Sequence, residues 1–173
     1  MASRRICIAV AVALQCGCTP PLPRFEKTLA AQDSATAALG AWCEARHIAS
    51  PARITASRIR GDDAPPPAEL AGANAGYRHV RLSCGNSVLS EAHNWYSRDL
   101  LTPEMNRVLD TTDTPFGTVV APLHFRRERL SSTRGAAAGC PAGTILSHRA
   151  RLTLPGGQPL ALLVECYTRA NLD

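Results

Sequence analysis

The chain has 173 residues, 45% of them hydrophobic, which suffices for one sizeable core and argues against two domains. Its formal charge of +5 comes almost entirely from arginine and is spread along the chain without a block of like charge. A dispersed surplus of this size is typical of a solvated surface, so we expect no nucleic-acid partner.

The N-terminus has the features of an export signal. Arg4-Arg5 precedes an apolar run, Ile6–Leu14, that is too short to span a bilayer. Gly17-Cys18 resembles the end of a bacterial lipoprotein signal, although Gln15 stands where that pattern prefers an aliphatic residue. We expect lipidation of Cys18; simple cleavage or a retained leader are the alternatives.

These features predict three segments: a signal over 1–18, a tether over 19–32, and a folded domain over 33–173. The protein would be exported and either periplasmic or anchored to the bacterial envelope, with membrane contact only through a lipid. Four cysteines remain in the domain, and an even number in an exported chain favours two disulfides with three possible connectivities; they are Cys43, Cys84, Cys140 and Cys166. Their spacing does not suggest zinc, so we expect no metal.

The predicted elements begin with a helix. Asp33-Ser34 caps residues 35–46, and a short strand covers 53–59. Pro65-Pro66-Pro67 then excludes regular structure from the following loop. Strands 77–84 and 87–96 flank a tight turn at Gly85-Asn86.

The second half continues with a helix that has Thr102 as N-cap and Pro103 at its first position. Residues 112–120 read as a short helix or turn, and 123–131 as a strand whose Arg126–Arg129 segment we expect in solvent. A second hairpin covers 145–154 and 159–168. Because the strands are mostly hairpin-linked, the prediction is α+β, a single antiparallel sheet with helices packed on it.

Two charged residues are out of place in this pattern. Strand alternation puts Arg78 on the apolar face of its strand, and Glu165 lies in a strand that is apolar on both faces. The two residues either pair with each other or face a common cavity. The hairpin register bears on this choice: a plain two-residue turn places Glu91 and His93 beside Arg78, whereas a bulged turn places Ala92 and Asn94 there.

A series of motifs then suggests a family. Tyr77-Arg78-His79-Val80, Thr114-Pro115-Phe116-Gly117, Arg149-Ala150-Arg151-Leu152, Gly157-Gln158-Pro159-Leu160 and Val164-Glu165 occur in an order and spacing that resemble the chorismate lyases. The resemblance covers about residues 77–172. It implies the chorismate-lyase-like fold, which is similar to the ligand-sensing domain of one class of bacterial transcription regulators.

The resemblance also implies site residues. Arg78 corresponds to the arginine that binds the substrate carboxylate, Glu165 to the active-site glutamate, and Ala92 and Phe116 to positions lining the product pocket, where the family has glycine and leucine. The family reaction is a carbon–oxygen lyase reaction that eliminates pyruvate from chorismate and leaves 4-hydroxybenzoate. Arg78 would anchor the carboxylate, while desolvation would raise the pKa of Glu165 and let it donate a proton.

The leading hypothesis is therefore a chorismate-lyase-like protein, monomeric and without cofactor. Since chorismate is a cytosolic metabolite, the export signal favours an alternative: a lipoprotein that binds a small aromatic or other cyclic carboxylate without turnover. A third reading is a structural envelope protein in which Arg78 and Glu165 only pair. If these two residues face one cavity, strand parity makes a Cys84–Cys166 bridge awkward, so we expect Cys43–Cys84 and Cys140–Cys166.

Overall fold

The computed structural model describes residues 21–61, 64–70 and 74–173, and these form one antiparallel sheet with helices on it. The six strands run in the order β1-β2-β3-β6-β5-β4. Their bounds are β1 Ile54–Arg58, β2 Ala75–Cys84, β3 Ser87–Ser97, β4 Arg126–Arg134, β5 Leu146–Thr153 and β6 Pro159–Tyr167. The predicted α+β class with a single antiparallel sheet is confirmed.

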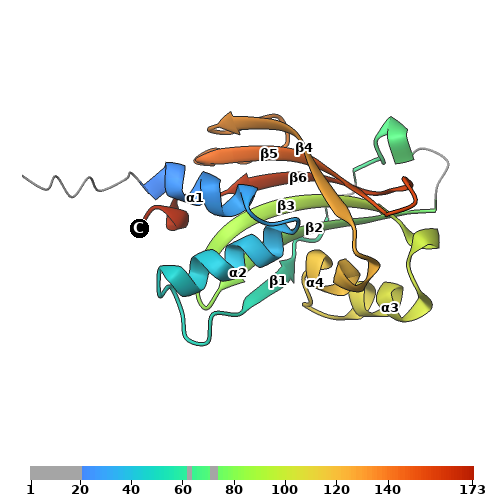
Figure 1. The fold of residues 1–173 in the computed structure, drawn as a ribbon, viewed down its shortest axis with the longest axis horizontal. Helices are drawn as coiled ribbons and strands as arrows, with labels where there is room; N and C mark the ends of the chain where they lie inside the picture. Colours follow the sequence, from blue (N-terminus) through green and yellow to red (C-terminus); the bar gives the residue numbers. More distant parts are fainter. Residues whose placement is uncertain (1–20, 62–63, 71–73) are drawn as a thin grey trace, which may run out of the picture.

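Within the described ranges, four α-helices accompany the sheet: α1 Pro21–Ala30, α2 Ala35–Ala45, α3 Pro103–Thr111 and α4 Phe116–Val120. Figure 1 shows α1 and α2 lying across the strands, with α3 and α4 together near the start of β4. Both predicted caps are present, because the Ser34 hydroxyl accepts from the Ala37 amide and the Thr102 hydroxyl from the Met105 amide. None of the helices in the described part combines the length and apolar character needed to cross a bilayer.

Helix α1 corrects the expected tether over 19–32. Its Phe25 and Leu29 are fully or almost fully buried, and the Phe25 ring packs against Trp42 of α2 and Tyr167 of β6. Two prolines near its start suggested an extended segment, but proline is tolerated in the first turn of a helix. The folded part therefore includes Pro21–Ala30, whereas the predicted signal over 1–18 and Cys18 lie outside the described residues.

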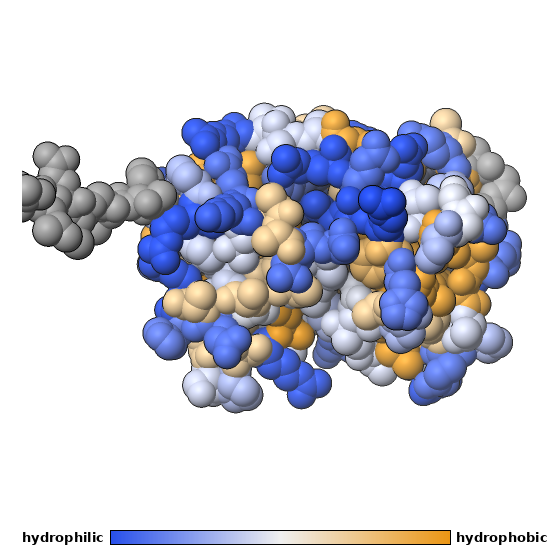
Figure 2. All heavy atoms as spheres, in the orientation of Figure 1, coloured by the Kyte–Doolittle hydropathy of each residue, from blue (hydrophilic) through white to orange (hydrophobic). Residues whose placement is uncertain are grey.

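The core lies between the helices and one face of the sheet. One apolar cluster joins α1 and α2 to the sheet, and a second joins α3 and α4 to β5 and β6. Figure 2 shows hydrophilic residues over much of this side of the molecule, with apolar residues gathered toward the end that carries α3 and α4.

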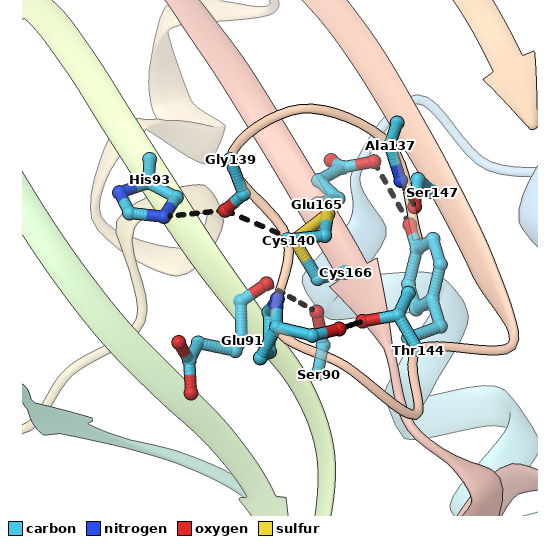
Figure 3. The surroundings of a disulfide bond; sticks show 12 residues. Ser90, Glu91, His93, Ala137, Gly139, Cys140, Thr144, Ser147, Glu165 and Cys166 are labelled. Carbon is cyan, nitrogen blue, oxygen red and sulfur yellow. Dashed lines mark hydrogen bonds between the residues drawn. A yellow bond between two sulfur atoms is a disulfide. The ribbon is translucent and has the colours of Figure 1, made fainter. Parts of the chain in front are cut away.

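Two disulfides fasten the sheet to its surroundings. Cys43 of α2 is joined to Cys84 of β2, and Cys140 of the β4–β5 loop is joined to Cys166 of β6. This is the pairing stated above. Figure 3 shows the second disulfide beside β6, where the His93 ring on β3 also bonds to the Gly139 carbonyl of the same loop. Paired disulfides are typical of an oxidising, extracytoplasmic compartment.

Candidate functional site

The hairpin β2–β3 decides which residues face the helices. Its turn has two residues, since Cys84 pairs with Ser87, but the register shifts between Leu82 and Ser83. This β-bulge, rather than a longer turn, places Ala92 opposite Val80 and Asn94 opposite Arg78. The sequence left two registers open, and the one with Ala92 and Asn94 on the face of Arg78 is the one found.

Strand β6 brings Glu165 onto the same face. Glu165 pairs with Ala92 on one side and with His148 of β5 on the other. Because directly paired residues project to the same side of a sheet, Arg78, Ala92, Glu165 and His148 all point toward the helices.

A small cavity separates this face from the starts of α2 and α4. Its walls are mostly apolar, with polar groups from both the sheet and the start of α2. The lining includes Val80, Leu82, Ala92, Phe116, Phe125, Leu163, Asp33, Ser34, Asn94, Arg127 and Glu165. The volume open to the centre of a water molecule is about 30 Å³. A buried water needs roughly 10–15 Å³ by this measure, so the cavity as it stands holds about two waters. Ala92 and Phe116 both line it, and Arg78 does not.

Glu165 is paired, but with a different arginine from the one expected. Arg127 of β4 donates to Glu165 Oε2 at 2.5 Å, and the Tyr167 hydroxyl donates to the same oxygen at 2.8 Å. The side chains of Arg127 and Glu165 are 6% and 3% exposed. The prediction that Arg126–Arg129 lies in solvent is therefore wrong for Arg127, because alternation along β4 points every second side chain inward.

Burial fixes the protonation of the groups around this pair. It raises the pKa of Tyr167 well above its usual range, so the hydroxyl stays protonated and donates. It lowers the pKa of His148 to about 4 despite the opposing charge of Glu165, so the imidazole is neutral at pH 7. Burial also opposes the charge on Arg127, but Glu165 outweighs it and the Arg127 pKa is raised.

Several buried polar atoms in this cluster have no hydrogen-bond partner within the described chain. They are Glu165 Oε1, Arg127 Nε and His148 Nε2. Such atoms are rare in folded proteins, because each one costs on the order of 1–3 kcal/mol when its hydrogen bond is left unmade. Two of the three belong to residues that line the cavity, so unused hydrogen-bonding capacity gathers at this end of it.

Arg78 has a different environment. It is 2% exposed, and its guanidinium donates to the carbonyls of Thr114 and Thr112 at 3.1 and 3.4 Å. Its Nε has no partner, and no carboxylate of the described residues forms an ion pair with it. Burial lowers the Arg78 pKa and nearby Arg58 adds to the effect, whereas the more distant charges of Asp110 and Asp113 oppose it. Neither expected relation to Glu165 is found, since the two residues do not pair and only Glu165 lines the cavity.

His93 lies on the opposite face of the sheet, because the register that would place it beside Arg78 is not the one found. His93 stacks on His79 with ring centroids 4.0 Å apart, and it shares a 2.7 Å hydrogen bond with the Tyr77 hydroxyl. It thus belongs to a ring stack outside the cavity. Within the described ranges, no group of three His, Cys, Asp or Glu side chains could hold a metal ion.

Sequence reasoning missed three residues of the site: Arg127, His148 and Tyr167. Tyr167 was within reach, because it lies two residues after Glu165 and so shares its face. His148 required the register of β5 against β6, which the Pro155–Gln158 turn alone does not fix. Arg127 gave no usable signal, since its neighbours on both sides in the sequence are charged as well.

Comparison with known proteins places the chain in a family. No protein-family model matches it. The protein named uncharacterized protein y4mC, from Sinorhizobium fredii, is 36% identical over 178 aligned positions, which cover 88% of this chain and 75% of that protein. The chain belongs to the y4mC family. This identity is high enough for the two proteins to share one fold.

Two solved structures also resemble this member of the y4mC family. The ligand-binding domain assigned to a GntR-family transcriptional regulator of Bordetella bronchiseptica is 15% identical, with a TM-score of 0.48 over 68% of this chain and 83% of that one. YydK of Bacillus subtilis, described as a possible transcriptional regulator, is 16% identical, with a TM-score of 0.47. That match covers 69% of this chain and 60% of YydK.

Proposed function

We propose that the protein binds a small aromatic or cyclic carboxylate between the sheet and helices α2 and α4, without converting it. The observation that carries the proposal is the buried Arg78 guanidinium, which has no carboxylate partner. Burying a charge without a counter-charge is costly, and an anionic ligand would offset that cost. A guanidinium also presents paired donors that match a carboxylate.

The cavity next to Arg78 supplies the rest of the site. Asn94, the cross-strand neighbour of Arg78, lines it together with apolar side chains such as Ala92 and Phe116. These walls suit a ring, and the unpartnered Glu165 Oε1 is an acceptor for a ring hydroxyl. Because the cavity now has room for about two waters, binding of a ring would require α2 or α4 to move outward.

The location we propose is outside the cytoplasm. The two disulfides support an oxidising compartment, and the predicted signal with Cys18 supports a lipoprotein of the bacterial envelope. A binding protein in this position would sequester or sense its ligand. We also expect the protein to act as a monomer and without a cofactor.

A chorismate-lyase activity is the second candidate, and one observation favours it. Glu165 lines the cavity with one oxygen unpartnered, where it could orient the ether side of a substrate. Against proton donation by Glu165, its other oxygen already accepts from both Arg127 and Tyr167. We therefore rank binding first, with Arg78 as anchor and Glu165 as the hydroxyl-orienting group.

A thermal-shift experiment tests the binding proposal. 4-Hydroxybenzoate and cyclohexanecarboxylate should raise the melting temperature of the protein, whereas the neutral 4-hydroxybenzamide should not. Arg78→Met should abolish the shift, and Arg126→Gln, an exposed arginine on β4, should leave it unchanged. If neither carboxylate stabilises the folded wild-type protein, the proposal is wrong.

The enzyme candidate has its own readout. Incubation with chorismate should release no pyruvate above background if the protein only binds. Release that depends on both Arg78 and Glu165 would instead establish the lyase reaction. Glu165→Gln keeps the shape of the side chain and is the informative variant for this comparison.

A further inference from the structure

A second, much larger hollow adjoins the cavity. This groove lies between α2, β1 and residues 112–118, and the volume open to water centres in it is about 700 Å³. The enclosed cavity offers about 30 Å³ by the same measure. A ligand that enters the cavity has this groove directly outside.

The two hollows share part of their lining. Ser34, Thr36 and Gly117 line both of them. The start of α4 approaches the start of α2 so closely at Gly117 that a Cβ there would lie 2.9 Å from the Thr36 hydroxyl and closer still to that of Ser34. Glycine is thus required for the closed contact, and parting these residues would join cavity and groove.

Arg78 lies behind the same boundary. Thr112 and Thr114, whose carbonyls accept its hydrogen bonds, also line the groove. An anion that enters from the groove therefore meets the segment covering Arg78 before it reaches the Glu165 end of the cavity.

The polar groups of the groove indicate what else the ligand carries. Arg53 and Asp113 give it opposite charges that balance. Thr55 and Thr118 are exposed, and their hydroxyls donate to no partner in the described part of the chain, so a ligand in the groove can reach both of them. A neutral extension with several hydroxyl groups suits such a lining better than a second charge or an alkyl chain.

We propose that the ligand has two parts: a ring carboxylate bound between Arg78 and the cavity, and a neutral, sugar-like extension that stays in the groove. Gly117 is the point where the ligand passes between the two hollows. This inference rests on the proposed function, because it assigns the remainder of the same ligand. The proposal predicts that an acid conjugated to a sugar binds more tightly than the free acid.

A matched pair of probes tests it, 3,4-dihydroxybenzoate and its 3-O-glucoside, because the glucoside keeps the 4-hydroxyl that Glu165 Oε1 would accept. Calorimetric titration should give at least about tenfold tighter binding for the glucoside, which corresponds to one or two additional hydrogen bonds. Thr55→Val with Thr118→Val should remove most of this advantage and leave the binding of free 3,4-dihydroxybenzoate unchanged. Thr133→Val, an exposed threonine on β4, is the control and should change neither affinity.

Two glycine variants test the passage. Gly117→Ala cannot keep the closed contact, so it should speed association of the glucoside by about threefold or more, measured by surface plasmon resonance. Gly40→Ala lies in α2 on the same groove, where an added Cβ meets Ile54 only at an ordinary 3.9 Å, and it should leave the rate unchanged.

The outcomes separate the two proposals. If 3,4-dihydroxybenzoate binds through Arg78 but its glucoside binds no more tightly, the two-part ligand is excluded and the proposed function stands. Equal association rates for Gly117→Ala and the wild type would exclude the passage at Gly117. If neither compound binds, the proposed function fails and this inference with it.

Discussion

Two buried arginines on one face of the sheet have opposite surroundings. Arg127 on β4 meets Glu165 at 2.5 Å, with Tyr167 bonded to the same carboxylate oxygen. Arg78 on β2 meets only backbone carbonyls. Both charges were removed from water during folding, yet only Arg127 has a carboxylate of the described chain within ion-pair distance.

The difference indicates which charge serves the fold and which is available to a ligand. A buried pair satisfies itself, and an arginine held by carbonyls alone keeps its net charge for a partner that is not part of the chain. Residue type and burial are similar for both arginines and do not distinguish these two roles. The hydrogen-bond and ion-pair partners of each guanidinium distinguish them.

The largest expected effect comes from breaking the buried pair. Arg127→Met should lower the free energy of unfolding by about 3–5 kcal/mol, because it leaves Glu165 buried without a counter-charge. Urea denaturation would measure this loss. The double variant Arg127→Met with Glu165→Leu should recover most of it, and a single variant as stable as the wild type would contradict the role given to the pair.

The next effect concerns His148, which faces both members of that pair. Its pKa is about 4 in the folded protein and about 6.5 in the unfolded chain, so the unfolded chain takes up the proton first as the pH falls. The neutral His148 side chain therefore contributes its full share of the free energy of unfolding above pH 6.5. This contribution should decrease by about 2–3 kcal/mol between pH 6.5 and 4.5.

Denaturation curves across this range would show that slope. His148→Gln should flatten it, and His124→Asn, at an exposed histidine with a left-handed backbone that asparagine tolerates, should preserve it. A slope that persists without His148 would assign it to other groups.

Arg78→Met should behave unlike Arg127→Met. We expect the free energy of unfolding to change by no more than about 1 kcal/mol, because the lost hydrogen bonds to Thr112 and Thr114 are offset by removal of an uncompensated charge. Chemical denaturation of both variants side by side would test the contrast. A loss as large as that of Arg127→Met would show that Arg78 is structural.

The smallest effect belongs to an exposed ion pair between β4 and β5. Arg151 of β5 contacts Glu128 of β4 at 2.5 Å, but their side chains are 38% and 58% exposed. Solvent and salt screen such a pair, so Arg151→Gln should cost less than about 0.5 kcal/mol. The cost should vanish in 1 M salt, where the Arg127–Glu165 pair should keep its contribution.

The sequence was informative where structure is local. Alternation within β2 placed Arg78 on the buried face of its strand correctly, and the run of apolar residues in β6 predicted the burial of Glu165. The caps at Ser34 and Thr102 were predicted from neighbouring residues alone. The antiparallel class followed from hairpin-length connections. These features depend on a few consecutive residues, so one sequence is enough to find them.

The sequence was uninformative where the partner of a buried side chain comes from a distant strand. Arg127 reaches Glu165 across β5, which depends on the registers of β4 with β5 and of β5 with β6. Both pairings contain an irregularity, and a shift of one residue would turn Arg127 to solvent. The expected Arg78–Glu165 relation failed for the same reason, since sharing a face does not specify distance along it.

Helix α1 has a consequence for how the protein would be held at a surface. It starts three residues after Cys18, and its Phe25 is packed on Tyr167, the residue that holds the Glu165 carboxylate. If Cys18 carries lipid as predicted, fewer than four residues would link the acyl chains to the packed helix, a span of roughly 10 Å. The domain would then lie close to the bilayer in a limited range of orientations, which a long flexible linker would not impose.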